Sequence, residues 1–207
     1  MPSTDPVGPP VVAIVGDRLA LGPLRRDLIP VYGRWTNDFA VTRTLRSSQP
    51  TTIEQVTASY DQLGGDERSV NFTIYLRDGW RPIGNTALVD LDWRARTAEF
   101  ILFIGEADCR GQGYGTEATR LMLDYAFTAL GLHSVMLKVY DFNLAGRRVY
   151  EKAGFRTIGR RRECQLMGGT LWDVEYMDCL AREFVSPTLH TIFTPDEPRA
   201  SGPVSTD

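Results

Sequence analysis

A glycine-rich run stands between an apolar strand and an amphipathic helix, and this arrangement restricts the fold more than any other feature of the chain. The run covers residues 110–116, and the apolar strand before it covers Phe100 to Ile104. Glycine accepts positive φ angles and lets the backbone come close to a bulky anion, because it has no Cβ. The helix that follows adds unpaired first-turn amides and the positive end of its dipole. The sequence therefore predicts a diphosphate cradle on a strand–loop–helix unit.

We expect the whole run to contact the diphosphate. Its backbone amides are free to point at phosphate oxygens, and Arg110 adds a permanent cation with a planar donor fork. The candidate ligand contacts are Arg110, Gly111, Gln112, Gly113, Tyr114, Gly115 and Thr116.

The elements around the cradle predict a mixed α/β fold with a mostly antiparallel sheet. After the cradle, apolar residues at 118, 121, 122, 125, 126 and 129 form one helical stripe, and Gly131 is placed to end that helix. Before it, strand-forming runs are separated by short polar turns that suit antiparallel neighbours. Strands are expected at 11–15, 18–21, 70–76, 82–91, 97–104, 135–140, 155–166 and 171–180. Helices are expected at 25–35, 52–63, 118–129 and 144–153.

Length and composition indicate a single domain. The chain has 207 residues with 43% hydrophobic content, which is enough for one sizeable core and too little for two ordinary domains. Proline and polar residues gather at both ends of the chain. We therefore expect a disordered tail over 1–10, one domain over 11–182, and a flexible tail over 183–207.

The net charge and the cysteine spacing argue against nucleic acid, disulfides and a bound metal. The formal net charge of −3 lacks the basic footprint of a nucleic-acid-binding protein. The three cysteines have no C-x-x-C spacing, so we expect neither a disulfide framework nor a bound metal. No apolar run approaches membrane-spanning length and no secretion signal is evident, so we expect a cytoplasmic protein without membrane contact.

A dinucleotide site is the main alternative for the cradle. Residues 113–118 also fit the G-x-G-x-x-A pattern, and Asp141 follows a strand where a ribose-binding carboxylate could stand. The pattern falls after several antiparallel strands rather than in a doubly wound series of βα units. An NAD-dependent oxidoreductase therefore stays the rival interpretation.

The segment from Ile104 to Phe155 resembles the acetyl-CoA-binding core of the Gcn5-related N-acetyltransferases. It is most similar to the branch of ribosomal-protein alanine and spermidine acetyltransferases, and the resemblance extends over about residues 11–182. Two separate motifs carry it. The family's Arg/Gln-x-x-Gly-x-Gly/Ala motif matches Arg110, Gly113 and Gly115, and its Asn, Tyr and Gly-Phe motif matches Asn143, Tyr150, Gly154 and Phe155. Gly146 departs from the family, which usually has alanine there.

The resemblance implies a central sheet of about seven strands flanked by about four helices and splayed at an acetyl-CoA site. It implies an N-acetyltransferase that uses acetyl-CoA as cosubstrate and no metal. The backbone near Phe103 and Ile104 would bind the pantetheine arm and polarise the thioester carbonyl. Tyr150 would be the general acid for the departing thiolate, and Asn143 would cap a helix and bind the pantetheine arm or a water.

Glu99, on the strand that leads to the cradle, is the candidate general base. An alkylamine resembles lysine, whose pKa is about 10.4, so at neutral pH only about one molecule in 10³ is uncharged and a base helps. A structural ion pair would explain a carboxylate at this position equally well.

The acceptor is the least determined part of the site. Trp35, Asn37 and Asp38 after the first helix, with Trp172 and Asp173 on the last hairpin, are the candidate acceptor-binding residues, because an aromatic wall with a carboxylate suits an amine. The same tryptophans could belong to the core. A protein N-terminus, a polyamine-like metabolite and an amino-sugar antibiotic all remain open, as do a homodimer and a non-catalytic acyl-CoA-binding module.

Overall fold

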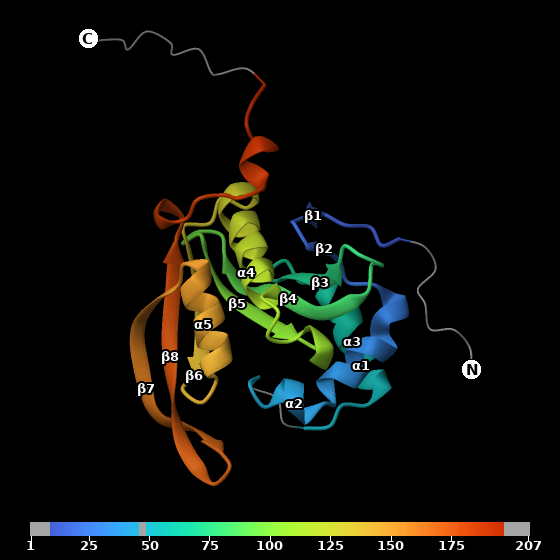
Figure 1. Ribbon diagram of the computed structural model, residues 1–207, viewed down its shortest axis with the longest axis vertical. Helices are drawn as coiled ribbons and strands as arrows, with labels where there is room; N and C mark the ends of the chain where they lie inside the picture. The colour runs from blue at the N-terminus through green and yellow to red at the C-terminus, as the bar shows by residue number, and fades with distance from the viewer. Residues whose placement is uncertain (1–8, 46–48, 197–207) are drawn as a thin grey trace.

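One mixed sheet forms the centre of the computed structural model, which describes residues 9–45 and 49–196 (Figure 1). Within these residues the sheet has eight strands in the order β1-β2-β3-β4-β5-β6-β8-β7. Every neighbouring pair is antiparallel except β5 and β6. The strands are β1 (Ile14–Val15), β2 (Leu19–Pro23), β3 (Val70–Leu76), β4 (Pro82–Asp92), β5 (Thr97–Ile104), β6 (Ser134–Tyr140), β7 (Arg156–Met167) and β8 (Thr170–Leu180).

Five α-helices are described, where about four were expected. They are α1 (Ile29–Thr36), α2 (Phe39–Thr42), α3 (Ile53–Leu63), α4 (Tyr114–Asp124) and α5 (Leu144–Ala153). The additional helix is α2, a single turn whose N-terminus is capped by the Asp38 side chain on the Ala40 amide. Its four residues are too few to show a helical hydrophobic period, so the sequence pattern does not predict it.

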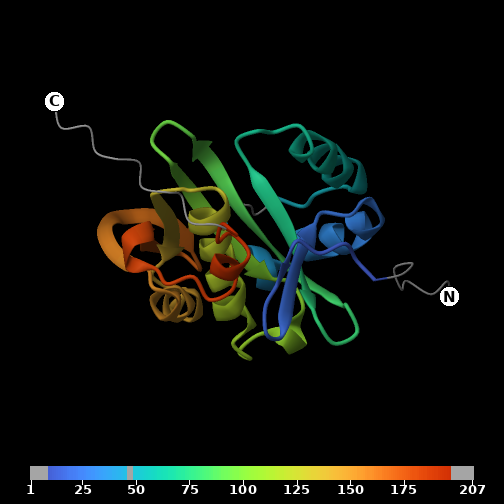
Figure 2. The same ribbon diagram turned by 90° about the horizontal axis from the view of Figure 1, so that it is seen from above.

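The helices cover the two faces of the sheet (Figures 1 and 2). Neighbouring strand residues point to opposite faces, and the cores follow this alternation. Ile74 belongs to the larger core with α4 and α5, whereas Tyr75 belongs to the smaller core with α1 and α3. The two helix pairs therefore lie on opposite sides, and β5 contributes residues to both cores.

Most local signals in the sequence have the predicted outcome. Thr52 and Gln55 form a reciprocal capping box at the start of α3. The hairpin between β7 and β8 turns at Gly168 and Gly169, both of which have positive φ. The helix after the cradle continues beyond Asp124 as a π-turn over Tyr125–Ala129, and Gly131 follows it at φ +66. The mixed, mostly antiparallel α/β fold is thus confirmed.

Part of the segment expected as a flexible C-terminal tail is docked on the domain. Asp124 is fully buried at the end of α4, and its carboxylate accepts hydrogen bonds from Ser186 Oγ and from the amides of Thr188 and Leu189. Leu189 is itself only 4% exposed in the larger core. Residues 186–189 therefore pack on the domain within the segment expected as a flexible tail, because a long-range carboxylate that no local pattern shows holds them. The expectations for 1–8 and 197–207 lie outside the described residues.

All three cysteines are free. Among the described helices, none is long and apolar enough to cross a membrane.

Candidate active site

The parallel strands β5 and β6 separate partway along their length (Figure 1). Their pairing joins Thr97–Glu99 to Ser134–Met136 and ends there. Beyond that point β5 stays paired with β4, and β6 stays paired with β8. The facing edges of β5 and β6 therefore offer backbone N–H and C=O groups to a ligand. Phe103 and Ile104, the expected pantetheine contacts, lie on this separated part of β5.

The glycine run lies at the end of β5 and forms the start of α4. Gly111 and Gly113 have φ angles of +75 and +86, and Gly113 is the N-cap residue of α4, with no side chain capping the helix. The amides of Tyr114 and Gly115 are in the first turn, where an α-helix provides no internal acceptor. Open amides at the positive end of a helix dipole are suited to phosphate.

Two arginines lie beside the glycine run: Arg110 points towards the end of β5, and Arg18 points towards the loop. The guanidinium of Arg110 donates to the carbonyl oxygens of Ile104 and Gly105, and it lies 3.8 Å from Asp38. Arg110 therefore holds the end of β5 as well as standing in the loop.

Arg18, immediately before β2, was not singled out from the sequence. Its guanidinium stacks over the Tyr114 ring at 4.7 Å and donates to the carbonyl of Gln112. Glu117 binds its Nε at 3.1 Å. Arg18 is separated from the loop by more than ninety residues of sequence, so no local motif links them.

Gln112 donates its side-chain amide to the carbonyl of Asp108, which closes the loop on itself. A Cβ on Gly115 would meet Val149 of α5 and Leu102 of β5 at 3.5 and 3.7 Å. The start of α4 is therefore packed closely against both neighbours. Thr116 is half-buried in the first turn.

Tyr150 lies on α5 and packs against the separated part of β5. Its ring meets Phe100 and Phe155 edge-on at 6.1 and 6.0 Å. Among the described residues its hydroxyl has no hydrogen-bond partner. Burial raises the pKa of Tyr150 to about 12, so its phenol is uncharged at neutral pH and available as a donor.

Asn143 caps α5, and Gly146 makes room for that cap. The Asn143 side chain accepts a hydrogen bond from the Gly146 amide at 3.0 Å. A Cβ at Gly146 would lie 2.5 Å from the Asn143 side-chain nitrogen. The glycine that departs from the family pattern therefore permits this position of the asparagine.

Glu99 and Lys138 form an ion pair across β5 and β6, where the two strands begin to separate. Their side-chain atoms are 2.6 Å apart, and the Glu99 side chain is 16% exposed. Glu99 shares its face of β5 with Ile101 and Phe103, because alternate residues of a strand point the same way. The candidate base thus lies on the face covered by α1 and α3, opposite Tyr150.

The predicted acceptor residues of the first helix do not come together around an opening. Trp35 is 1% exposed, packs against Tyr32 and Phe103, and donates its indole N–H to Glu106. Asn37 connects α1 to Thr51 through hydrogen bonds in both directions, and Asp38 caps α2.

The predicted acceptor residues of the last hairpin lie at the other side of the splay. Trp172 contacts Phe142 edge-on at 5.7 Å, and Phe142 stacks on Tyr140 at 5.2 Å. Asp173 accepts a hydrogen bond from the Glu163 amide and pairs with Arg160 at 3.4 Å. An aromatic row therefore follows the C-terminal end of β6, with the carboxylate of Asp173 engaged in the hairpin.

Glu106 is a second residue that the sequence reasoning missed. It follows β5 directly and accepts hydrogen bonds from Arg34, Trp35 and Arg81. Burial alone would raise the pKa of Glu106, but the hydrogen bonds from Arg34 and Trp35 lower it overall. Glu106 thus ties α1 to the entrance of the glycine loop.

Comparisons with known proteins agree with this geometry. The profile of the Acetyltransferase (GNAT) domain matches residues 18–156. The chain is 34% identical over 120 residues to the probable N-acetyltransferase YjcK of Bacillus subtilis, a match that covers 58% of this chain and 65% of YjcK. It is 28% identical over 157 residues to the human α/β-tubulin-N-acetyltransferase 9, covering 70% and 75%.

Among solved structures, the spermidine N-acetyltransferase of Vibrio cholerae in complex with CoA and spermine superposes with a TM-score of 0.76. That alignment covers 80% of this chain and 97% of the other at 24% identity, so it supports the fold. The chain therefore belongs to the GNAT acetyltransferase family. A doubly wound dinucleotide fold is excluded by the sheet order, in which the described strands contain one parallel pair.

Proposed function

We propose that this protein transfers an acetyl group from acetyl-CoA directly to a primary amine. The observation that carries the proposal is the separation of β5 from β6 immediately beside the glycine run at the start of α4. A thioester arm fits between the separated strands, while its diphosphate meets the open amides of the loop. Family membership supports acyl-CoA as the donor.

In this proposal the donor is held mainly by backbone. Amides over residues 111–116 bind the diphosphate, and the guanidinium of Arg18 supports the same loop from β2. The pantetheine arm pairs with the free edge of β5 near Phe103 and Ile104. One amide of this edge stabilises the thioester oxygen as negative charge develops on it.

The reaction needs a base for the amine and a hydrogen-bond donor for the departing thiolate. The candidates for these roles, Glu99 and Tyr150, lie on opposite faces of the sheet. The uncharged amine nitrogen attacks the thioester carbon, so a C–N bond forms and the C–S bond then breaks. The proton lost by nitrogen passes to Glu99, directly or through a water, because Glu99 lies where β5 and β6 begin to separate, on the face covered by α1 and α3. The sulfur leaves as a thiolate towards Tyr150.

Tyr150 is better suited to hydrogen-bond the thiolate than to give up its proton completely. The pKa of Tyr150 is about 12, whereas a thiol has a pKa of about 8.5. Complete transfer of the phenol proton to the thiolate would therefore be uphill. The phenol therefore stabilises the sulfur anion, which takes its final proton from water.

We propose a small molecule as the acceptor rather than a folded surface. The solved relative is named for spermidine and contains spermine, while another relative is named for tubulin. A polyamine-like metabolite and an amino sugar are therefore the small molecules to compare, and a protein N-terminus is the contrasting class. The homodimer stays a prediction.

Turnover assays with purified protein test the proposal. Acetyl-CoA and NAD(H) are titrated separately in a thermal-shift assay, and thiol release is followed over amines that include N-terminal peptides. We expect stabilisation by acetyl-CoA and turnover of at least one amine. Stabilisation by NAD(H) alone would overturn the proposed donor. Binding of acetyl-CoA with no turnover of any amine would favour a non-catalytic acyl-CoA-binding module.

The role of Glu99 is tested by comparing Glu99→Gln with Lys138→Gln. If Glu99 is the base, Glu99→Gln lowers kcat about 10²-fold. Lys138→Gln retains the carboxylate and has a much smaller effect. Equal effects of both variants would show that the ion pair is structural.

A further inference from the structure

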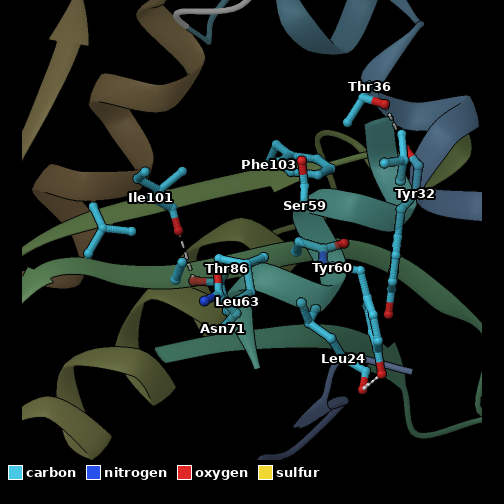
Figure 3. Close-up of a pocket in the computed structure, with 14 residues that line it drawn as sticks. Leu24, Tyr32, Thr36, Ser59, Tyr60, Leu63, Asn71, Thr86, Ile101 and Phe103 are labelled. Atoms are coloured by element: carbon cyan, nitrogen blue, oxygen red, sulfur yellow. Dashed lines mark hydrogen bonds between the residues drawn. The ribbon is translucent and has the colours of Figure 1, made fainter. Parts of the chain in front are cut away.

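A cavity of about 240 Å³ lies between α1, α3 and the face of the sheet that these helices cover (Figure 3). Its floor is made by cross-strand neighbours of β3, β4 and β5. Asn71 and Ile101 flank Ala87, and Asn85 lies opposite Phe103. Tyr60 lines the cavity from α3 and reaches the carbonyl of Leu24. A dry cavity of about 150 Å³ is known to hold benzene, so this space is large enough for an aromatic ring with a short chain.

The cavity continues towards the candidate base. Val89 lines it and lies directly opposite Glu99 in the register of β4 and β5. Direct partners in an antiparallel pair point to the same face, so Glu99 stands beside the floor. Ile101, the next residue on this face, is 37% exposed on the separated part of β5. A molecule whose body fills the cavity would therefore hold its amine near Glu99 and the thioester.

The lining of the cavity is uncharged. None of its 14 residues is acidic or basic. An adjoining hollow contains Asp61, but the carboxylate of Asp61 is paired with Arg26. Away from Glu99, an ammonium group placed in the cavity would find no carboxylate among the lining residues, and burial of an unpaired charge is strongly unfavourable.

The polar groups that do line the cavity are mostly engaged. Thr86 donates to the carbonyl of Ile101, and the Tyr60 hydroxyl donates to the carbonyl of Leu24 (Figure 3). Ser59 is exposed to solvent, whereas the side-chain oxygen of Asn85 is buried and has no hydrogen-bond partner among the described residues. The cavity is thus suited to an apolar group that carries at most one neutral hydrogen-bond donor.

We propose that the acceptor is a monoamine with an uncharged, mainly apolar body of the size of one aromatic ring or a branched aliphatic group. This inference rests on the proposed acetyl transfer and specifies its substrate class. It separates the protein from a polyamine acetyltransferase, because a polyamine would bring a second ammonium to a space with no counter-charge.

A three-amine panel tests the substrate class. Thiol release from acetyl-CoA is measured with 2-phenylethylamine, isopentylamine and spermidine. We expect the kcat/KM of the better monoamine to exceed that of spermidine by about tenfold or more. A kcat/KM for spermidine that equals or exceeds those of both monoamines overturns the inference but leaves acetyl transfer standing.

Two independent substitutions test the location. Ala87→Leu fills the floor of the cavity, and Ser59→Phe fills it from the exposed side of α3 without altering the core. Each should lower kcat/KM for 2-phenylethylamine about tenfold, with the KM for acetyl-CoA within about twofold of the parent value. Ala95→Leu and Ala58→Phe, outside the cavity, are the matched controls. Unchanged amine kinetics in a folded Ala87→Leu or Ser59→Phe variant overturns the location.

Failure of the proposed function is recognised separately. It shows as binding of acetyl-CoA without thiol release from any amine. The cavity is then tested by binding alone. Saturable thermal stabilisation by 2-phenylethylamine in the presence of CoA, lost in Ala87→Leu, supports the site, and no stabilisation in the parent protein overturns it.

Discussion

The phenol of Tyr150 is held by two aromatic rings rather than by hydrogen bonds. Phe100 and Phe155 set the ring angle, and burial keeps the hydroxyl protonated by raising its pKa to about 12. The ring therefore belongs to the core, while the oxygen is available to a ligand. Removing the hydroxyl oxygen of Tyr150 therefore tests its chemical role while the packing of the ring is kept.

We expect Tyr150→Phe to lower kcat by about 10- to 100-fold, the cost of one hydrogen bond to a developing charge. The Kd for acetyl-CoA should stay within about twofold, because the ring contacts remain. Stopped-flow thiol release and calorimetric titration of acetyl-CoA measure the two quantities. Tyr125→Phe, on the π-turn, is the control. A parallel loss of affinity and turnover would contradict the assigned role.

At the scale of elements, the start of α4 depends on backbone conformation more than on side chains. Gly113 has a φ of +86, and an added Cβ would lie 3.3 Å from the Arg18 guanidinium. A β-branched residue is strained at such an angle. A substitution there would therefore displace both the loop amides and the arginine.

We expect Gly113→Val to raise the Kd for acetyl-CoA by more than about tenfold, and Arg18→Gln to raise it about three- to tenfold by removing one partly exposed cation. Gly168→Val, at the hairpin turn with φ +59 and open space around it, is the control for backbone strain. Equal loss of affinity in Gly168→Val would show that general destabilisation, not the cradle, is responsible.

The C-terminal segment is attached to α4 through one buried carboxylate. Asp124 accepts hydrogen bonds from Thr128, Ser186, Thr188 and Leu189. We expect Asp124→Ala to lower the free energy of unfolding by about 3 kcal/mol, which corresponds to roughly 6–12 °C in Tm for a chain of this size. Limited proteolysis of the variant should cut the chain within the segment that follows residue 183. A protected segment with an unchanged Tm would contradict this attachment.

At the scale of the whole molecule, the sheet separates two cores, and both contain a phenol with a raised pKa. Burial raises the pKa of Tyr75 to about 12 in the smaller core, as it does for Tyr150 in the larger one. A phenol has a pKa of about 10 in the unfolded chain. The folded state therefore binds these protons more tightly than the unfolded state.

Stability should consequently fall at high pH. The contribution is complete below about pH 10 and is lost as the pH rises through about 12, because the unfolded chain ionises first. For Tyr75, which is fully buried, two units correspond to about 3 kcal/mol. Urea unfolding over this range should show the decline, and Tyr75→Phe should reduce its slope. An unchanged slope in the variant would refute the assignment.

Much of this architecture is local and follows from the sequence. The capping box at Thr52, the turn at Gly168 and Gly169, and the helix stripe before Gly131 depend on residues within a few positions of one another. The glycine run and the Asn143 cap are also local features of this kind. Their outcomes depend on φ preference and hydrogen-bonding reach, which a single segment carries with it.

Only the tertiary structure decided which side chains face the site and which hold the surrounding backbone or pack in the core. It placed Arg18 against the loop, turned Arg110 to the end of β5, and buried Trp35 on Glu106. It also made the uncharged cavity from three strands and two helices. These arrangements join residues that are distant in the chain, so their energies depend on packing and burial that no local pattern contains. The sequence by itself determined the glycine run and the family, and the fold determined the shape and the charge of the cavity near it.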